Sequence, residues 1–196
     1  MTHKQYNMEF NLVQWQILDN NGMPMPWFTH NCLDWMKQQD WSEKTIIMFG
    51  AGLGDSWLAS KCKKLYIVER NEDWLQKSKS VSAHFGVTNI EYIYRPCNDS
   101  DGKADYYLQI PDGVDIIIND DAYRTELCQD AIDYFRFAER EGILICDNWY
   151  QSFVWLSDKA VEIMNPYLKD ALIFEQADHT DNDGVNKWKT AAFFIN

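Results

Sequence analysis

Three glycines at alternate positions, Gly50, Gly52 and Gly54, are the first residues whose spacing points to chemistry. They follow an apolar run and precede a possible helix start, and a glycine loop in that place lets backbone N–H groups approach a ligand closely. The pyrophosphate-binding pattern G-x-G-x-x-G is not met, because the sixth position counted from Gly50 is Asp55. The loop, which also contains Ala51, therefore predicts a ligand with little negative charge.

A carboxylate ends the next apolar run. Glu69 lies fifteen residues beyond Gly54 and nineteen beyond Gly50, near the offset expected of an acid that binds a ribose diol. Alone, Glu69 would be read as a surface carboxylate at a strand end, but the glycine loop on the preceding strand favours ribose binding. Asn98, past the third predicted strand, is a candidate contact for an adenine amino group.

Acidic and amide side chains follow two later apolar runs. Asp120 and Asp121 end "IIINDD", and Asp147 and Asn148 end "ILICDN". Because neighbouring strands lie about 5 Å apart, we expect Asp120, Asp147 and Asn148 to converge at the catalytic end of a site. Two carboxylates and an amide oxygen are hard ligands that suit Mg²⁺. The alternative is that the aspartates only cap loops while Asn148 bonds to the backbone.

A parallel sheet is needed to position these residues. Strands are predicted at Lys44–Phe49, Lys64–Glu69, Asn89–Tyr94, Val114–Asn119 and Gly142–Asp147. Helical patterns alternate with them, one capped by Asn71 and another by Thr125, which is typical of an α/β fold. Two final apolar runs, within residues 171–178 and 187–196, have no helix between them and predict an antiparallel pair.

Composition narrows the class of protein. The chain has 196 residues, which predicts one domain over 1–196. Its formal net charge of -12 argues against nucleic acid as a partner, because phosphate binding needs clustered Lys and Arg. Five scattered cysteines without C-x-x-C spacing suggest no zinc site or disulfide framework. No run approaches membrane-spanning length, so the expected setting is the cytoplasm, without a membrane partner. Oligomeric state cannot be read.

Five short motifs occur in a fixed order along the chain. They are Pro24-Met25-Pro26-Trp27-Phe28-Thr29, the glycines from Gly50 to Gly54, Asp121-Ala122-Tyr123-Arg124-Thr125-Glu126, Asp147-Asn148 and Thr190-Ala191-Ala192-Phe193-Phe194. Together they resemble the class I S-adenosylmethionine-dependent methyltransferases, and more narrowly a group of small, mostly uncharacterised proteins with a P-x-P-W-[FI]-T segment. The resemblance covers nearly the whole chain.

The resemblance implies a fold, a cofactor and an activity. The fold is a Rossmann-like, mostly parallel seven-stranded sheet with a C-terminal antiparallel hairpin and helices on both faces. The cofactor is S-adenosyl-L-methionine, whose methyl group goes to an oxygen or nitrogen of a small molecule. Residues 1–40 would form a lid segment, and Thr29 within it would contact the cofactor. The implied cofactor contacts are Thr29, Gly50, Ala51, Gly52, Gly54, Glu69, Asn98 and Asp120.

A partial similarity to catechol-type O-methyltransferases bears on the metal. It assigns Asp120, Asp147 and Asn148 as ligands of a divalent ion, with Mg²⁺ the expected ion if one is used. Two positions depart from these families: Met48 replaces an acid before the glycine loop, and Tyr123 replaces a lysine base. These departures keep a non-catalytic adenosine-ligand binder open as an alternative. A nicotinamide-dependent oxidoreductase on a related fold is the other, although the missing G-x-x-G spacing and the terminal antiparallel pair count against it.

Overall fold

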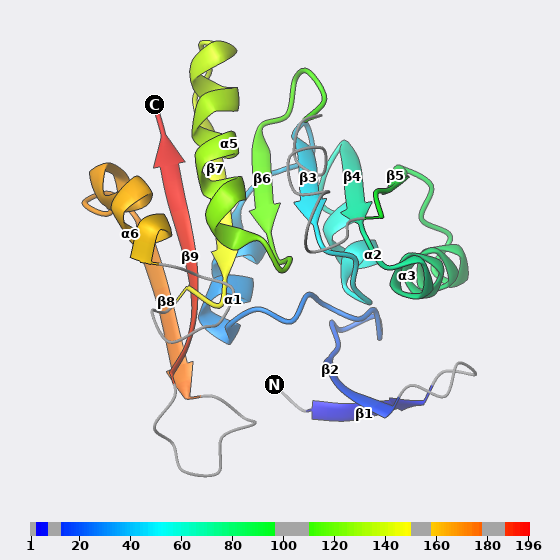
Figure 1. Ribbon diagram of the computed structural model, residues 1–196. Helices are drawn as coiled ribbons and strands as arrows, with labels where there is room; N and C mark the ends of the chain where they lie inside the picture. Colours follow the sequence, from blue (N-terminus) through cyan, green and yellow to red (C-terminus); the bar gives the residue numbers. More distant parts are fainter. Residues whose placement is uncertain (1–2, 8–12, 97–109, 150–157, 178–186) are drawn as a thin grey trace.

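The computed structural model describes residues 3–7, 13–96, 110–149, 158–177 and 187–196. Its strands are β1 His3–Asn7, β2 Val13–Ile17, β3 Thr45–Phe49, β4 Lys64–Glu69, β5 Ile90–Tyr94, β6 Ile116–Asn119, β7 Gly142–Asp147, β8 Leu172–Ala177 and β9 Lys187–Ile195. Seven of them form one sheet in the order β5-β4-β3-β6-β7-β9-β8, with helices on either side (Figure 1). The predicted α/β architecture is confirmed.

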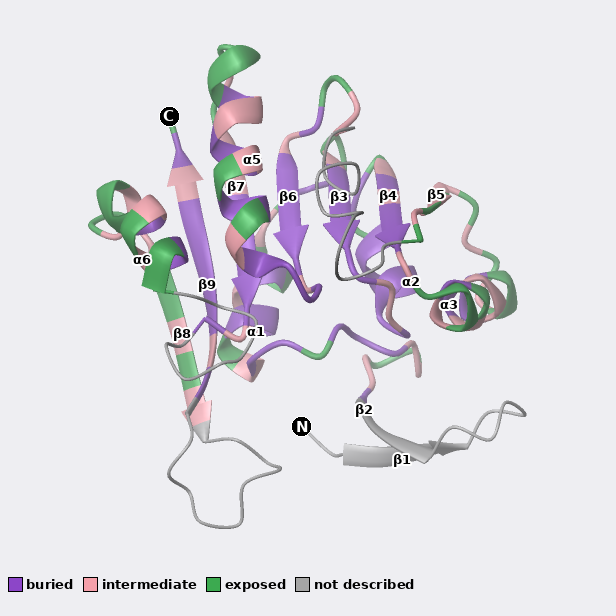
Figure 2. Cartoon of the chain, viewed as in Figure 1, coloured by how far each residue is buried: buried purple, intermediate pink, exposed green. Residues whose placement is uncertain are grey.

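The strand pairing follows the predicted pattern. Strands β5, β4, β3, β6 and β7 pair in parallel, whereas β9 pairs antiparallel with both β7 and β8. Strands β4 and β7 have the predicted bounds, and the other predicted parallel strands differ at their starts by one or two residues. Continuous apolar runs explain this success, since the central strands are buried on both faces (Figure 2).

The N-terminal region contains a hairpin that the sequence did not suggest. Strands β1 and β2 pair antiparallel as a separate sheet, beside the strand ends of the main sheet (Figure 1). An isolated bridge between Leu18 and Pro24 then leads the chain into the Pro24–Thr29 motif. No strand was predicted within residues 1–40, because the mixed polar pattern of this segment conceals β1 and β2.

The helices agree with the predicted alternation. They are α1 His30–Gln38, α2 Asp55–Ala59, α3 Glu72–His84, α5 Arg124–Phe137 and α6 Asp158–Met164, followed by a 3-10 turn, η1, at Asn165–Tyr167. Asn71 caps α3 as expected, accepting hydrogen bonds from two backbone N–H groups. Thr125 is not a cap, because α5 begins at Arg124, whose carbonyl accepts a hydrogen bond from the Asn119 side chain.

Two apolar cores cover the two faces of the sheet. One joins α5 and α6 to side chains such as Ile117, Leu144 and Phe193. The other joins α1 and α2 to the opposite side chains, such as Ile46 and Ile118. Alternate residues of each strand therefore point to different cores, and helices cover both faces as the resemblance implied.

Candidate functional site

The glycine loop lies at the carboxyl end of β3, close to the end of β6. Gly50 has a φ of 98°, and a Cβ there would lie 2.5 Å from the carbonyl oxygen of Asp120. Only glycine fits this backbone conformation and close approach. The tight contact brings the chain at Gly50 directly against Asp120. The glycine loop therefore lies beside Asp120, which together with Asp147 and Asn148 we call the acidic rim of the sheet.

Gly54 has a different partner. A Cβ at Gly54 would lie 2.2 Å from the backbone nitrogen of Pro26, within the motif Pro24–Thr29. The Pro24–Thr29 motif thus packs directly on the glycine loop. At Gly52 a Cβ would meet nothing closer than 3.8 Å, so there steric crowding does not require a glycine.

Carboxylates satisfy the N–H groups of this loop. Oε2 of Glu69 accepts a hydrogen bond from the Ala51 N–H at 2.7 Å, and both carboxylate oxygens of Asp55 lie 3.1 Å from the Gly52 nitrogen. The Gly50 N–H donates to the Val68 carbonyl. Three successive N–H groups are therefore already paired within the protein.

Asp55 binds the glycine loop from the first residue of α2. It is buried at the start of α2, and the Ser78 hydroxyl donates to its Oδ2. Burial raises the pKa of Asp55 to about 7, and the nearby charge of Glu69 acts in the same direction. Met48, which replaces the acid expected before the loop, is instead buried in the sheet core. Asp55 therefore adds a second carboxylate to this loop, beside Glu69.

Glu69 joins the loop to the following helix. While Oε2 binds Ala51, Oε1 accepts the Asn71 N–H at 2.6 Å. Burial raises the pKa of Glu69 above its ordinary value, although the hydrogen bonds from Ala51 and Asn71 oppose the shift. Each carboxylate oxygen retains a second lone pair, so Glu69 can still accept hydrogen bonds from a ligand.

A cavity of about 490 Å³ opens at these strand ends. It is lined by Gly50, Ala51, Glu69, Arg70, Asn71, Trp74, Asp120, Asp121, Ala122 and Arg124. Predicted site residues from β3, β4 and β6 therefore line one cavity, at the sheet edge where open α/β folds bind ligands.

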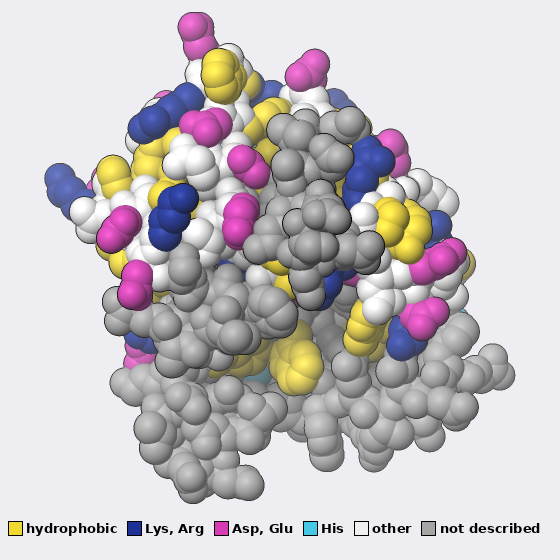
Figure 3. Space-filling model, viewed as in Figure 1, with side chains coloured by type: hydrophobic (Ala, Val, Ile, Leu, Met, Phe, Trp, Pro, Cys, Tyr) yellow, Lys and Arg dark blue, Asp and Glu magenta, His cyan; other side chains and the backbone are white. Residues whose placement is uncertain are grey.

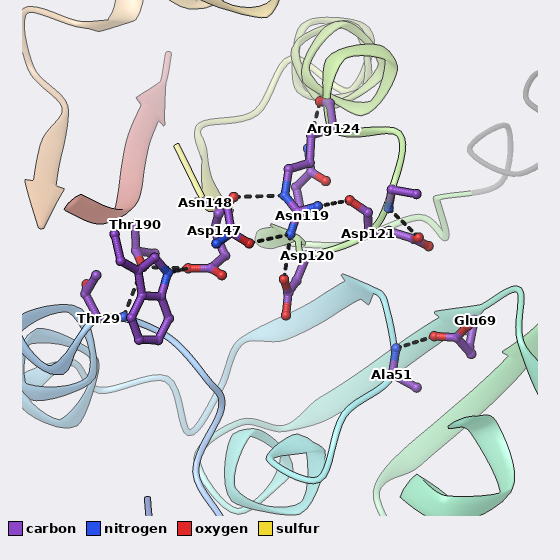
Figure 4. Close-up of polar contacts among 12 residues, drawn as sticks. Thr29, Ala51, Glu69, Asn119, Asp120, Asp121, Arg124, Asp147, Asn148 and Thr190 are labelled. Carbon is purple, nitrogen blue, oxygen red and sulfur yellow. Dashed lines mark hydrogen bonds and ion pairs between the residues drawn. The ribbon is translucent and has the colours of Figure 1, made fainter. Parts of the chain in front are cut away.

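Arg124 is the hub of the acidic rim (Figure 4). Its Nη2 donates to Oδ1 of Asp120 at 2.8 Å and to Oδ1 of Asn148 at 2.9 Å. Its Nε donates to the Asp147 carbonyl at 2.9 Å, and Nη1 donates to the Asp121 carbonyl. The buried guanidinium thus joins the loop after β6 to the end of β7.

Asp147 points the other way, toward β9 (Figure 4). Its Oδ1 accepts hydrogen bonds from Trp188 Nε1 at 3.0 Å and Thr190 Oγ1 at 2.8 Å. The same Thr190 oxygen accepts the Thr29 N–H at 3.1 Å. Three sequence motifs therefore meet in one network, which ties the Pro24–Thr29 motif to the end of β7. Thr29 itself is the N-cap of α1, but its hydroxyl makes no capping hydrogen bond.

The two aspartates of the rim are electrostatically linked. Burial raises the pKa of Asp147 to about 6, although Arg124 and the hydrogen bond from Thr190 oppose this. Loss of hydration and the charge of Asp147 raise the pKa of Asp120 well above its ordinary value. Carboxylates with raised pKa values are better proton acceptors at neutral pH than ordinary ones.

The predicted ligands do not fit a divalent ion in this arrangement. The Oδ1 atoms of Asp120 and Asn148 share the Arg124 guanidinium, and Asp147 Oδ1 is bonded to β9. The Arg124 guanidinium therefore already binds two of the three side chains that were expected to bind the metal. Among the described residues, no cluster of three or more His, Cys, Asp or Glu side chains could hold a metal.

The fold has clear counterparts among solved structures. Precorrin 8W decarboxylase of Methanobacterium thermoautotrophicum matches with a TM-score of 0.60 and 17% identity, over 91% of this chain and 96% of that one. A SAM-dependent methyltransferase of Aquifex aeolicus matches at 0.53 and 13%, over 86% and 91%. An rRNA methylase of Streptococcus thermophilus matches at 0.53 and 16%, over 85% and 96%. The chain has the class I methyltransferase fold.

The comparisons go no further than this fold. No protein-family model matches the sequence, and no curated protein does. The narrower motif group therefore stays a prediction. Within the ranges that the structure describes, no helix of this methyltransferase fold combines the length and apolar character needed to cross a bilayer.

The predicted residues separate into two parts of the methyltransferase fold. Gly50, Ala51, Glu69 and Asp120 line the cavity, whereas Asp147 and Thr29 belong to the network on β9. Gly52 and Gly54 support the loop from outside the cavity lining. Asn98 lies outside the described residues.

Sequence reasoning missed several contributors. Asn71 was predicted only as a helix cap, and no role in the site was predicted for Trp74, yet both line the cavity. Trp188 was not singled out, and Thr190 was noted only within a motif. The signal for Thr190 was its place in the final strand, because β7 and β9 pair with Asp147 opposite Thr190.

Proposed function

We propose that the protein transfers a methyl group from S-adenosylmethionine to an oxygen or nitrogen of a small molecule. The observation that carries this proposal is the hydrogen bond between Glu69 Oε2 and the Ala51 N–H, on the wall of the cavity. It places a carboxylate able to bind a ribose beside a loop whose glycines allow close approach of a nucleoside.

The paired loop N–H groups favour this cofactor over a dinucleotide. A pyrophosphate is held chiefly by loop N–H groups at a helix N-terminus. In this chain the N–H groups of Gly50, Ala51 and Gly52 already have acceptors, two of them carboxylates. A diphosphate would compete with Glu69 and Asp55 and be repelled by both. The nicotinamide alternative is therefore the weaker one.

The cavity residues fit a sulfonium nucleoside. Glu69 would accept hydrogen bonds from the ribose hydroxyls, and Trp74 offers an aromatic surface on the same wall. Asp120 would lie near the positive charge, and a carboxylate there favours a cation. When bound, S-adenosylmethionine supplies an activated methyl group. The protein's own task is to hold the acceptor in line with it and to exclude water.

Asp120 is our candidate for the group that takes a proton from the acceptor. It lines the cavity and its pKa is raised, as general base catalysis at neutral pH requires. Asp147 and Asn148 complete the catalytic end, Asn148 through its hydrogen bond to Arg124. No step is assigned to Mg²⁺, because Arg124 binds two of the three expected ligands.

Charge supports a small acceptor over nucleic acid. The chain carries a formal net charge of -12, and the described Lys and Arg side chains on the face in Figure 3 alternate with Asp and Glu. A backbone of phosphates needs a continuous basic surface. The rRNA methylase and this chain share a fold at 16% sequence identity. A shared fold does not specify the methyl acceptor, which depends on the residues of the site.

We place this reaction in the cytoplasm, within a single domain over residues 1–196. The four described cysteines, Cys32, Cys62, Cys128 and Cys146, are buried free thiols. Free thiols are typical of a reducing compartment.

Calorimetric titration tests the proposal. We expect S-adenosylmethionine and S-adenosylhomocysteine to bind and NADH not to bind. Turnover with a panel of acceptors then separates an enzyme from a non-catalytic adenosine-ligand binder. Absence of S-adenosylmethionine binding at millimolar concentration would refute the proposal.

A further inference from the structure

We propose that the methyl acceptor is an amine, bound as an ammonium cation by Oδ2 of Asp120. This inference rests on the proposed function and names the class of substrate for the same cavity. It depends on which polar groups of the cavity are already paired and which are left for a ligand.

Both guanidiniums of the cavity are committed to the protein. Arg124 makes four hydrogen bonds, to Asp120, Asp121, Asp147 and Asn148. Arg70 lies 3.3 Å from Oδ1 of Asp121, with its guanidinium 5.8 Å from the centre of the Tyr123 ring. Each guanidinium already faces an aspartate, so a carboxylate, phosphate or phenolate acceptor would compete with a carboxylate of the protein for it.

Asp120 offers a ligand a negatively charged hydrogen-bond acceptor in place of a guanidinium. Arg124 binds its Oδ1, while no described residue donates a hydrogen bond to its Oδ2. The side chain is 26% exposed and lines the cavity. Figure 4 shows its carboxylate pointing away from helix α5. Arg124 is therefore a positioning residue, which fixes one oxygen and leaves the other for a hydrogen-bond donor.

The charge at this end of the cavity favours cationic ligands over anionic ones. Arg124 binds the Asp120 carboxylate but reaches Asp147 only at its backbone carbonyl, and the Asp147 carboxylate is bonded to the neutral Trp188 and Thr190. The sulfonium of the cofactor and an ammonium acceptor would both meet negative charge here. An anionic acceptor would add to it in a site of low dielectric, which is costly.

The transfer to an amine balances with the groups present. The bound ammonium loses one proton to Oδ2 of Asp120, and its freed lone pair forms a bond to the methyl carbon of S-adenosylmethionine. The carbon–sulfur bond breaks, and its electron pair stays on sulfur. The positive charge moves from sulfur to nitrogen, so the products are a methylated ammonium and a thioether. The proton on Asp120 then passes to water.

Matched ligands test this inference without knowledge of the natural acceptor. The protein is saturated with S-adenosylhomocysteine and titrated with sets of amine, alcohol and carboxylic acid on the same aliphatic or aromatic skeleton. We expect at least one amine to bind tenfold or more tighter than its alcohol and acid. Asp120→Asn should reduce this preference below threefold, while Asp112→Asn, an exposed aspartate, should preserve it.

Three results would overturn the inference. One is that no amine binds more tightly than its alcohol and acid. Another is that the preference survives in Asp120→Asn. The third is that Asp120→Asn weakens S-adenosylhomocysteine binding more than threefold, which would assign Asp120 to the cofactor. If S-adenosylhomocysteine itself does not bind, the proposed function fails instead, so the two failures are distinguishable.

Discussion

Glu69 Oε2 accepts a hydrogen bond from the Ala51 N–H at 2.7 Å, which ties the end of β4 to the loop after β3. The second oxygen of the same carboxylate binds the Asn71 N–H at 2.6 Å. One buried side chain thus fixes both the glycine loop and the start of α3. It also forms part of the cavity wall, so its loss should affect ligand binding as well as stability.

Glu69→Gln should weaken the binding of S-adenosylhomocysteine by roughly tenfold or more. An amide has only one acceptor oxygen, so its NH₂ group would face either the Ala51 or the Asn71 N–H. The mismatch should also lower the free energy of unfolding by about 1–3 kcal/mol. Titration calorimetry and urea denaturation measure the two effects.

Glu72→Gln is the matched control for this change. Glu72 is exposed in the first turn of α3, and its substitution by glutamine removes the same charge as Glu69→Gln does. If both variants bind S-adenosylhomocysteine as tightly as the wild type, Glu69 does not hold the ligand.

Gly50→Ala should destabilise the protein far more than Gly52→Ala. A methyl group at Gly50 would lie 2.5 Å from the Asp120 carbonyl oxygen and would strain a φ of 98°. We expect a cost of roughly 2–4 kcal/mol, against less than about 1 kcal/mol at Gly52, where there is space. Equal urea midpoints for the two variants would contradict the observed loop geometry.

Thr190→Val should destabilise the contact between the lid segment and β7. The valine has a similar shape but cannot accept the Thr29 N–H or donate to Asp147. An unpaired buried N–H costs about 1–3 kcal/mol, and the lost hydrogen bond should raise the pKa of Asp147 further. Urea denaturation measures the first effect, and a carboxyl titration followed by NMR measures the second.

Thr190→Ser keeps the hydroxyl and serves as the control. It should hold the pKa of Asp147 near its wild-type value. If the serine variant shifts this pKa as far as the valine variant does, the shift comes from packing and not from the hydrogen bond.

Removal of divalent ions should leave the site intact. The Arg124 guanidinium already binds Asp120 and Asn148, so EDTA should change neither S-adenosylhomocysteine binding nor methyl transfer. Calorimetry and turnover with and without EDTA check this. Loss of turnover in EDTA, restored by Mg²⁺ alone, would instead support the metal site that the sequence suggested.

The central strands could be predicted because the feature that defines them, a continuous apolar run, is visible in a few consecutive residues. Runs such as Ile116–Asn119 are buried on both faces and are continuously apolar in the sequence. The N-terminal hairpin could not, because β1 and β2 form a two-stranded sheet of mixed polar and apolar residues. Patterns that short do not distinguish a strand from a loop.

The candidate site was predictable in part for a related reason. Parallel strands bring their carboxyl ends to one edge, so Gly50, Glu69 and Asp120 could be placed together. The role of Thr190 depends on the register of β7 against β9, which aligns it with Asp147. The role of Arg124 depends on where its long side chain ends. Neither the register nor a side-chain direction is encoded in local spacing.

Asp55 should make the stability of the protein depend on pH. Burial raises its pKa in the folded protein to about 7, from 3.8 as the ordinary value. Between these values the folded protein holds a proton that the unfolded chain has released, so the free energy of unfolding falls as the pH rises. From pH 5 to 8 the fall due to Asp55 should be roughly 2–3 kcal/mol.

Asp55→Asn should remove this part of the pH dependence. Asparagine can still accept the Gly52 N–H, and it carries no charge to lose hydration. Asp120 and Asp147 also have raised pKa values, and both remain in the variant. The charge of Asp55 raises the pKa of Asp120, so its removal lowers that pKa and flattens the pH dependence in the same direction. Urea denaturation at pH 5, 6, 7 and 8 measures the two curves. Parallel curves would mean that Asp55 is already ionised at pH 5, and that the glycine loop is held by an ordinary carboxylate.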